Sequence, residues 1–165
     1  MTLTRSCELY IDGASHGNPG PAGVGVVLKE GKTTIRQFAQ YIGETTNNVA
    51  EYLALVYALQ EALQAGYPVV MVKTDSELLA RQLNGQYKVK DPQLRLFHDL
   101  ARHLIAGFRS VTITHIPRTE NTHADRLAGK AVDERVRVGG TAGSGRRSKG
   151  ASPSLHATVI GSLFE

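Results

Sequence analysis

Four acidic residues stand at the ends of patterned segments rather than in ordinary polar stretches: Asp12, Glu51, Asp75 and Asp125. Carboxylates that gather in one crevice repel one another, and such a cluster persists in proteins when hard cations neutralise it. Mg²⁺ prefers oxygen ligands of this kind. If the fold brings the four side chains together, the sequence indicates a magnesium site.

Each of these residues also has a purely structural interpretation. Asp75 is suited to cap the helix that follows it, because its side chain can accept from backbone N–H groups there. Asp125 in a first helical turn is favoured by the helix dipole, and Glu51 can face solvent on its helix. Asp12 is the exception, since aspartate is depleted in strands. Spacing alone therefore leaves both interpretations open.

The elements that must position these side chains follow from the periodicity of apolar residues and from turn and cap signals. Alternation or continuous apolar character predicts strands, and apolar residues at helical spacing predict helices. A turn is expected at 30–32, Thr46 or Asn47 is expected to cap the long helix, and Asn121 is expected to cap the last helix. The predicted strands are 7–12, two within 22–42, 68–74 and 110–116, and the predicted helices are 46–66, 76–83, 91–106 and 122–136.

The resulting order is β-β-β-α-β-α-α-β-α. It predicts the α/β class, with one five-stranded mixed sheet and helices on both faces. The continuous apolar run at 68–74 predicts a strand buried on both faces. In such sheets the crevice for ligands lies beyond the carboxyl ends of the parallel strands. Asp75 falls there by connectivity, and Asp12 reaches it if the first strand runs beside the fourth.

Composition divides the chain into three parts. We predict a folded domain at 1–138, a flexible linker rich in Gly, Ser and Arg at 139–154, and a short hydrophobic segment at 155–165. The formal net charge of +4 is weak evidence for a polyanionic partner. One cysteine excludes an intrachain disulfide, and no apolar run is long enough to span a membrane. We therefore expect a cytoplasmic protein with no membrane partner.

Four longer stretches, in this order, resemble type 1 ribonuclease H: YIDGASHGNPGPAGVGVVL, TTNNVAEYLALVYAL, VKTDSELL and HIPRTENTHADRLAGKA. The similarity covers about residues 6–134. It implies the five-stranded ribonuclease H-like fold. It also implies an endoribonuclease that cleaves the RNA strand of RNA–DNA hybrids by two-metal-ion hydrolysis, leaving 5′-phosphate and 3′-hydroxyl ends.

The same resemblance implies roles for individual residues. The four carboxylates Asp12, Glu51, Asp75 and Asp125 match the ligands of two Mg²⁺ ions, for which Mn²⁺ can substitute. His115 matches a histidine that assists proton transfer in long bacterial members, although a polar residue at a strand end is the simpler interpretation. Arg118 is the competing candidate, because it can stabilise charge on a phosphate.

Contacts to the hybrid are implied at the first loop and at the start of the long helix: Gly13, Asn18, Thr46, Asn47 and Asn48. Amide side chains both donate and accept hydrogen bonds, which suits recognition of a 2′-OH in a wide, shallow minor groove. The structural alternative for Asn47 and Asn48 is helix capping.

Two departures from the long members affect these expectations. The basic, Trp-bearing handle is missing, so only a short link with Lys88 and Lys90 joins two helices, and we expect weaker hybrid binding with a steeper salt dependence. Glu77 stands where long members often carry glutamine, which leaves the RNA contact there uncertain. We expect a monomer, because no unexplained apolar patch is evident before the last segment.

The last residues Ser162, Leu163 and Phe164 resemble the end of the motif by which bacterial replication proteins dock on the sliding clamp. The usual glutamine is missing, and a hydrophobic segment folding back on the domain is the alternative. Two other functions compete with hydrolysis of hybrids. One is a hybrid-binding module without catalysis, and the other is a nuclease of the same fold that acts on other substrates.

Overall fold

The computed structural model describes residues 4–135, and the expectations for the linker, the last segment and its clamp contact lie outside them. The predicted order of strands and helices is confirmed, with one short 3-10 helix, η1, added. The elements are β1 (Ser6–Ser15), β2 (Gly20–Glu30), β3 (Thr33–Thr45), α1 (Asn47–Gln64), β4 (Val69–Thr74), α2 (Glu77–Leu83), α3 (Pro92–Ile105), β5 (Ser110–His115), η1 (Arg118–Glu120) and α4 (Thr122–Glu134).

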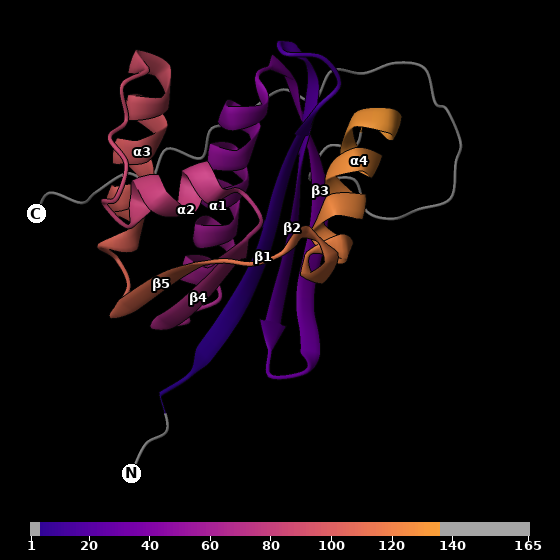
Figure 1. Ribbon diagram of the computed structural model, residues 1–165. Coiled ribbons are helices and arrows are strands. Elements are labelled where there is room, and N and C mark those ends of the chain that lie inside the picture. The colour runs from indigo at the N-terminus through magenta and orange to yellow at the C-terminus, as the bar shows by residue number, and fades with distance from the viewer. Residues whose placement is uncertain (1–3, 136–165) are drawn as a thin grey trace, which may run out of the picture.

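The five strands form one mixed sheet in the order β3-β2-β1-β4-β5. β1, β2 and β3 are antiparallel neighbours, whereas β1 pairs with β4 and β4 pairs with β5 in parallel. Helices α1, α2 and α3 lie on one side of the sheet and α4 lies on the other (Figure 1). The predicted α/β class, with helices on both faces, is confirmed.

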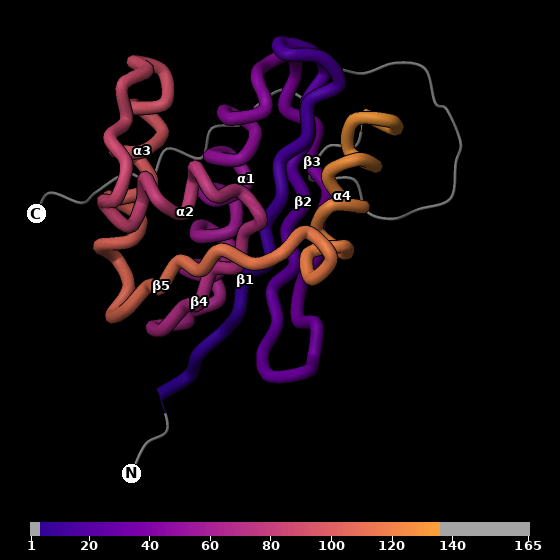
Figure 2. The backbone as a smooth tube through the Cα atoms, in the orientation of Figure 1, coloured from indigo at the N-terminus to yellow at the C-terminus, as the bar shows by residue number. Residues whose placement is uncertain are grey.

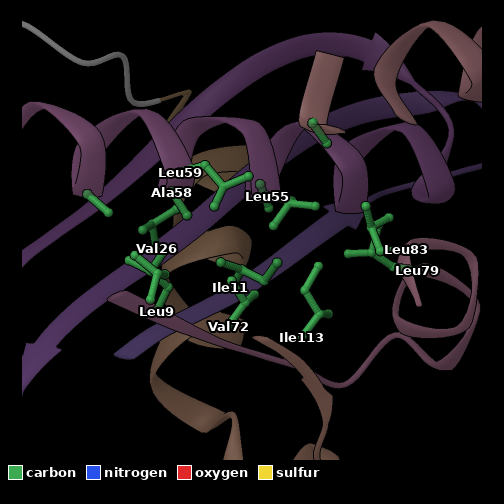
Figure 3. Packing of buried hydrophobic residues seen from close by; sticks show 14 of the residues in the cluster. Leu9, Ile11, Val26, Leu55, Ala58, Leu59, Val72, Leu79, Leu83 and Ile113 are labelled. Carbon is green, nitrogen blue, oxygen red and sulfur yellow. The ribbon is translucent and has the colours of Figure 1, made fainter. Parts of the chain in front are cut away.

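The core lies between the sheet and α1. Alternate residues of β1, among them Leu9 and Ile11, are fully buried and meet Leu55 and Leu59 of α1 (Figure 3). Burying apolar side chains of this size contributes about 1.5–3 kcal/mol each, as an upper estimate. Since Ile11 faces α1, its neighbour Asp12 projects from the other side of the strand.

Three helices begin with side-chain caps. Thr46, Ser76 and Asp91 each accept a hydrogen bond from a backbone N–H in the first turn of α1, α2 and α3. Ser76 caps α2, so the capping interpretation of Asp75 is wrong. Asn121 holds the cap position of α4, but its side chain makes no capping hydrogen bond. The structural alternative of capping by Asn47 and Asn48 also fails, because Thr46 performs that role.

Two strand predictions need correction. β1 does not end at Asp12 but continues to Ser15, because it stays paired with β2 as far as Ala22. β4 is fully buried on one face only, since alternate residues are buried and the others are half-buried. The reason is that α4 packs over β1, β2 and β3 and leaves the second face of β4 partly open. Within residues 4–135, no helix is both long and apolar enough to cross a bilayer.

The turns at the two ends of the meander lie far apart. The β2–β3 hairpin and the β1–β2 connection are at opposite ends of the sheet (Figure 2). The carboxyl end of β1, where Asp12 lies, is near the β1–β2 connection and far from the hairpin. The candidate site therefore occupies one end of the molecule.

Candidate active site

The parallel pairing of β1 with β4 sets the first two carboxylates side by side. Ile11 pairs with Thr74 across these strands. Asp12 is the next residue on β1 and Asp75 comes directly after β4, so they emerge together at the carboxyl edge of the parallel pair. This is the arrangement that the sequence predicted on the condition that the first strand runs beside the fourth.

Glu51 joins them from the first turns of α1. Its Oε2 accepts a hydrogen bond from the Gly13 N–H at 3.1 Å, and the side chain is 6% exposed. Gly13 has to be glycine, because a Cβ there would lie 2.3 Å from the carbonyl carbon of Ala50. The close approach of α1 to β1 thus buries Glu51, and the interpretation of Glu51 as a solvent-facing charge is wrong.

Asp12, Glu51 and Asp75 each offer a carboxylate oxygen, and these oxygens all lie within 4.8 Å of one another. Burial, followed by the charge of Asp75 and the proximity of Asp125, raises the pKa of Asp12 from 3.8 to about 8. Burial, followed by the charges of Asp12 and Asp75, raises the pKa of Glu51 well above its ordinary value. The carboxyl groups resist ionisation because no positive charge lies among them. A hard divalent cation, which binds oxygen ligands, would supply that charge.

Asp125 approaches the cluster from the first turn of α4. It lines the same cavity of about 690 Å³ as the other three carboxylates, but it is not one of the close trio. Its Oδ1 lies 3.3 Å from Nη2 of Arg118, which also lines the cavity. The structure therefore brings all four predicted carboxylates to one cleft, with Asp125 paired to a cation.

His115 is placed differently from Arg118. It ends β5, it is exposed, and it pairs with Thr74 one strand further from β1. His115 is not among the described residues that line the cavity, whereas Arg118 is. In this geometry Arg118 is the nearer of the two competing candidates to the carboxylates.

Of the residues expected to contact a nucleic acid, Gly13 and Asn47 line the cavity. Asn18 Oδ1 accepts a hydrogen bond from the Asn47 backbone N–H at 3.1 Å, which ties the β1–β2 connection to the start of α1. Asn47 and Asn48 are both exposed. The Thr46 hydroxyl caps α1 by accepting a hydrogen bond from the Val49 N–H at 3.3 Å. Glu77, the departure noted above, is bonded to Arg81 one turn along α2.

Two positioning residues were missed by the sequence analysis. Asn121 is 1% exposed, and its Nδ2 donates to the Ile11 carbonyl at 2.8 Å, which ties the start of α4 to β1 beside Asp12. Gly25 lets α4 approach β2, since a Cβ there would lie 2.2 Å from the Ala124 carbonyl oxygen. The cap position of Asn121 and the glycines of GVGV were visible signals, but their partners lie about a hundred residues away.

Comparison with known proteins agrees with this arrangement. A family model described as reverse transcriptase-like matches residues 10–131. Ribonuclease HI of Halobacterium salinarum is 46% identical over 126 residues, which cover 76% of this chain and 63% of that protein. Ribonuclease H of Saccharopolyspora erythraea is 37% identical, with 79% of this chain and 92% of that protein covered. The chain spans only 34% of several mycobacterial relatives.

A solved structure extends the comparison to three dimensions. LC11-RNase H1 in complex with an RNA/DNA hybrid superposes with a TM-score of 0.75 at 41% identity, covering 78% of this chain and 98% of that chain. The fold and the carboxylate-lined cleft define a protein of the ribonuclease H-like class. Within that class, the chain belongs to the type 1 ribonuclease H family.

Proposed function

We propose that the protein is an endoribonuclease that cleaves the RNA strand of RNA–DNA hybrids by two-metal-ion hydrolysis and leaves 5′-phosphate and 3′-hydroxyl ends. The observation that carries the proposal is the trio Asp12, Glu51 and Asp75, whose oxygens lie within 4.8 Å of one another at the carboxyl edge of the sheet. Membership of the type 1 family and the hybrid bound by LC11-RNase H1 support the choice of substrate.

The proposed ligands of Mg²⁺, or of Mn²⁺ in its place, are Asp12, Glu51, Asp75 and Asp125. Two such ions, when bound, lower the pKa of an attacking water and stabilise the leaving 3′ oxygen. The chain contributes a preorganised cluster. The Gly13 N–H fixes Glu51, and Asn121 fixes the backbone next to Asp12.

The proposed hybrid contacts occupy the rim next to the carboxylates. Asn18, Asn47 and Asn48 present amides that can donate to and accept from a 2′-OH and base edges. Thr46 offers a place for a DNA phosphate at the start of α1. Gly13 contributes slim backbone, because its N–H is already bonded to Glu51.

Arg118 and His115 remain alternative assistants to catalysis, and their chemistry separates them. A guanidinium that stabilises phosphate charge stays protonated, so Arg118→Ala is expected to lower kcat without changing the shape of the pH–rate profile. A histidine that transfers a proton changes its protonation state during the reaction, so His115→Ala is expected to change the shape of that profile. If a substitution changes neither kcat nor the shape of the pH–rate profile, the residue that it replaces takes no part in catalysis.

The test of the proposed function is cleavage of a labelled hybrid in Mg²⁺. Asp12→Asn and Asp75→Asn are each expected to lose on the order of a thousandfold or more in kcat. Glu30→Gln, an exposed position beside the β2–β3 turn at the opposite end of the sheet, is the matched control and should retain full activity. Near-wild-type cleavage by either site variant would contradict the metal assignment.

A substrate panel separates the rival functions. Hybrid, duplex RNA, duplex DNA and single strands are incubated with the protein in Mg²⁺ and in Mn²⁺. Selective cut products from the RNA strand of the hybrid support the proposal. Binding without cutting in either metal supports a hybrid-binding module, and cutting of another duplex supports a nuclease of different specificity.

We further propose that the protein is a cytoplasmic monomer. Sedimentation of the purified chain tests the oligomeric state.

A further inference from the structure

The cleft extends beyond the carboxylates along one face of α4. Asp125 and Gly129 are one helical turn apart and line the same cavity, as do Arg126 and Lys130, which follow them in the sequence and lie together on the neighbouring face of the helix. Arg126 and Lys130 are separated by about 6 Å along the helix axis. A cationic wall therefore continues directly from the acidic cluster.

The side chains of Arg126 and Lys130 have no ion-pair or hydrogen-bond partner among the described residues. Both side chains are exposed. Of the other groups in the cavity, Arg118 pairs with Asp125, and Asp133 Oδ1 lies 3.8 Å from His16 Nδ1. Exposed cations without an internal partner are free to bind an anionic ligand in the cleft.

Gly129 provides an independent observation. It lies in the interior of α4, where glycine is the least favourable residue apart from proline. Gly25, which faces this helix from β2, is required by close packing, but a Cβ at Gly129 would meet no protein atom within 4 Å. Packing within the described residues therefore gives no reason for glycine here, and the open space lies in the cleft.

We propose that Arg126, Gly129 and Lys130 form a binding subsite for the phosphodiester backbone of the nucleic acid as it leaves the carboxylate cluster. Gly129 lets the strand approach the helix backbone, and the two cations supply positive charge on the adjacent face of the helix. This inference rests on the proposed function, because it assigns a further part of the same cleft to the same substrate.

The first test measures binding of a labelled RNA–DNA hybrid in EDTA, so that no cleavage occurs, at several salt concentrations. Arg126→Ala and Lys130→Ala are each expected to weaken binding about three- to tenfold and to lower the salt slope by about 1. Lys32→Ala, an equal loss of charge at the distant β2–β3 turn, is the matched control and should change neither quantity. Unchanged affinity and slope in the Arg126 and Lys130 variants would overturn the subsite.

Gly129→Ala gives a second readout that misfolding cannot mimic. Alanine favours the helix, so the melting temperature is expected to rise by about 3 °C while hybrid binding weakens. Gly129→Leu, also a good helix former, should weaken binding further because it fills more of the cleft. Tighter or unchanged binding by both variants would contradict a close approach of the strand.

Neutral methylphosphonate linkages identify the strand. They are placed one at a time in the RNA strand or in the DNA strand, and the penalty of Lys130→Ala should disappear at the linkage that the lysine contacts. A penalty that persists at every linkage would overturn phosphate binding. If the wild-type protein neither binds nor cuts the hybrid, the proposed function itself fails, which is distinct from a wild-type enzyme that is unaffected by these variants.

Discussion

At the scale of single residues, the cluster is a place where burial and like charges act in the same direction. Asp12 is 5% exposed and faces Asp75 and Asp125, so its proton is held until its pKa of about 8. Burial and the charges of Asp12 and Asp75 likewise raise the pKa of Glu51, even though the hydrogen bond from the Gly13 N–H favours its ionised form. The metal-free protein is therefore expected to carry protons in its site at neutral pH.

This raised pKa predicts how stability depends on pH in EDTA. A carboxyl group whose pKa rises on folding stabilises the fold below its unfolded pKa, near 4, and that contribution is lost as pH rises through its folded pKa, near 8. Asp12→Asn removes the effect, so its free energy of unfolding relative to wild type should increase by on the order of 2 kcal/mol between pH 5 and pH 8.

Urea denaturation at each pH measures the difference. Adding Mg²⁺ at pH 8 should stabilise the wild type and should stabilise Asp12→Asn much less, because the ion binds the folded cluster. Parallel pH profiles for the two proteins in EDTA would show that Asp12 is not buried among like charges.

Asn121 yields a second prediction at this scale. Asn121→Ala leaves the buried Ile11 carbonyl without its donor, so we expect a loss of about 1–3 kcal/mol in stability and a lower kcat. Asp91→Ala, which removes the cap of α3, is the control and should cost about 1 kcal/mol without lowering kcat. If both variants retain full kcat at a temperature where they are folded, Asn121 is only a structural residue.

At the scale of elements, two glycines of β2, Gly23 and Gly25, allow α4 to pack closely against the sheet. Gly25→Ala would place a Cβ 2.2 Å from the Ala124 carbonyl oxygen, so α4 must shift and carry Asp125 with it. We expect a loss of about 1–3 kcal/mol in stability and a reduced kcat in Mg²⁺. Denaturation and cleavage assays check both, and a variant as stable and as active as wild type would show that the approach is looser.

The sequence predicted the elements better than their surroundings. Apolar periodicity reports which residues of a segment are buried, and it placed every strand and α-helix of residues 4–135 but not the short η1. It does not report which element covers them, so β4 was expected to be buried on both faces and β1 to end at Asp12. Asn121 was assigned to a cap because that preference is local, whereas its partner Ile11 is 110 residues away.

For the site, too, the positions along the chain were predictable from the sequence, whereas the burial and the contacts were not. Asp75 could be placed at the ligand edge from connectivity alone, and Asp12 on the condition that β1 runs beside β4, because the rule for parallel strands is topological. The burial of Glu51 could not, since it depends on the close approach of α1 at Gly13. Motif resemblance supplied the grouping of all four before any contact was known.

At the scale of the whole molecule, positive charge is spread to both sides of the acidic cleft. The short link between α2 and α3, together with α3, surrounds a second cavity of about 580 Å³. Its cations are Lys88, Lys90, Arg95 and Arg102. α2 starts two residues after Asp75 and ends next to this link, a distance of about 10 Å along the helix. We propose that a hybrid centred on the carboxylates also contacts this second surface.

This placement predicts that the short link replaces part of the missing basic handle. Lys88→Ala and Lys90→Ala together are expected to raise KM for the hybrid about threefold to tenfold and to lower the salt slope of binding by about 2, because two phosphate contacts are lost. The value of kcat at saturating hybrid should stay unchanged, since neither lysine lines the carboxylate cavity. Steady-state cleavage in Mg²⁺ at increasing salt measures all three quantities, with Lys32→Ala as the control for charge. An unchanged KM and slope would place the duplex away from the link and leave α4 as the principal cationic contact.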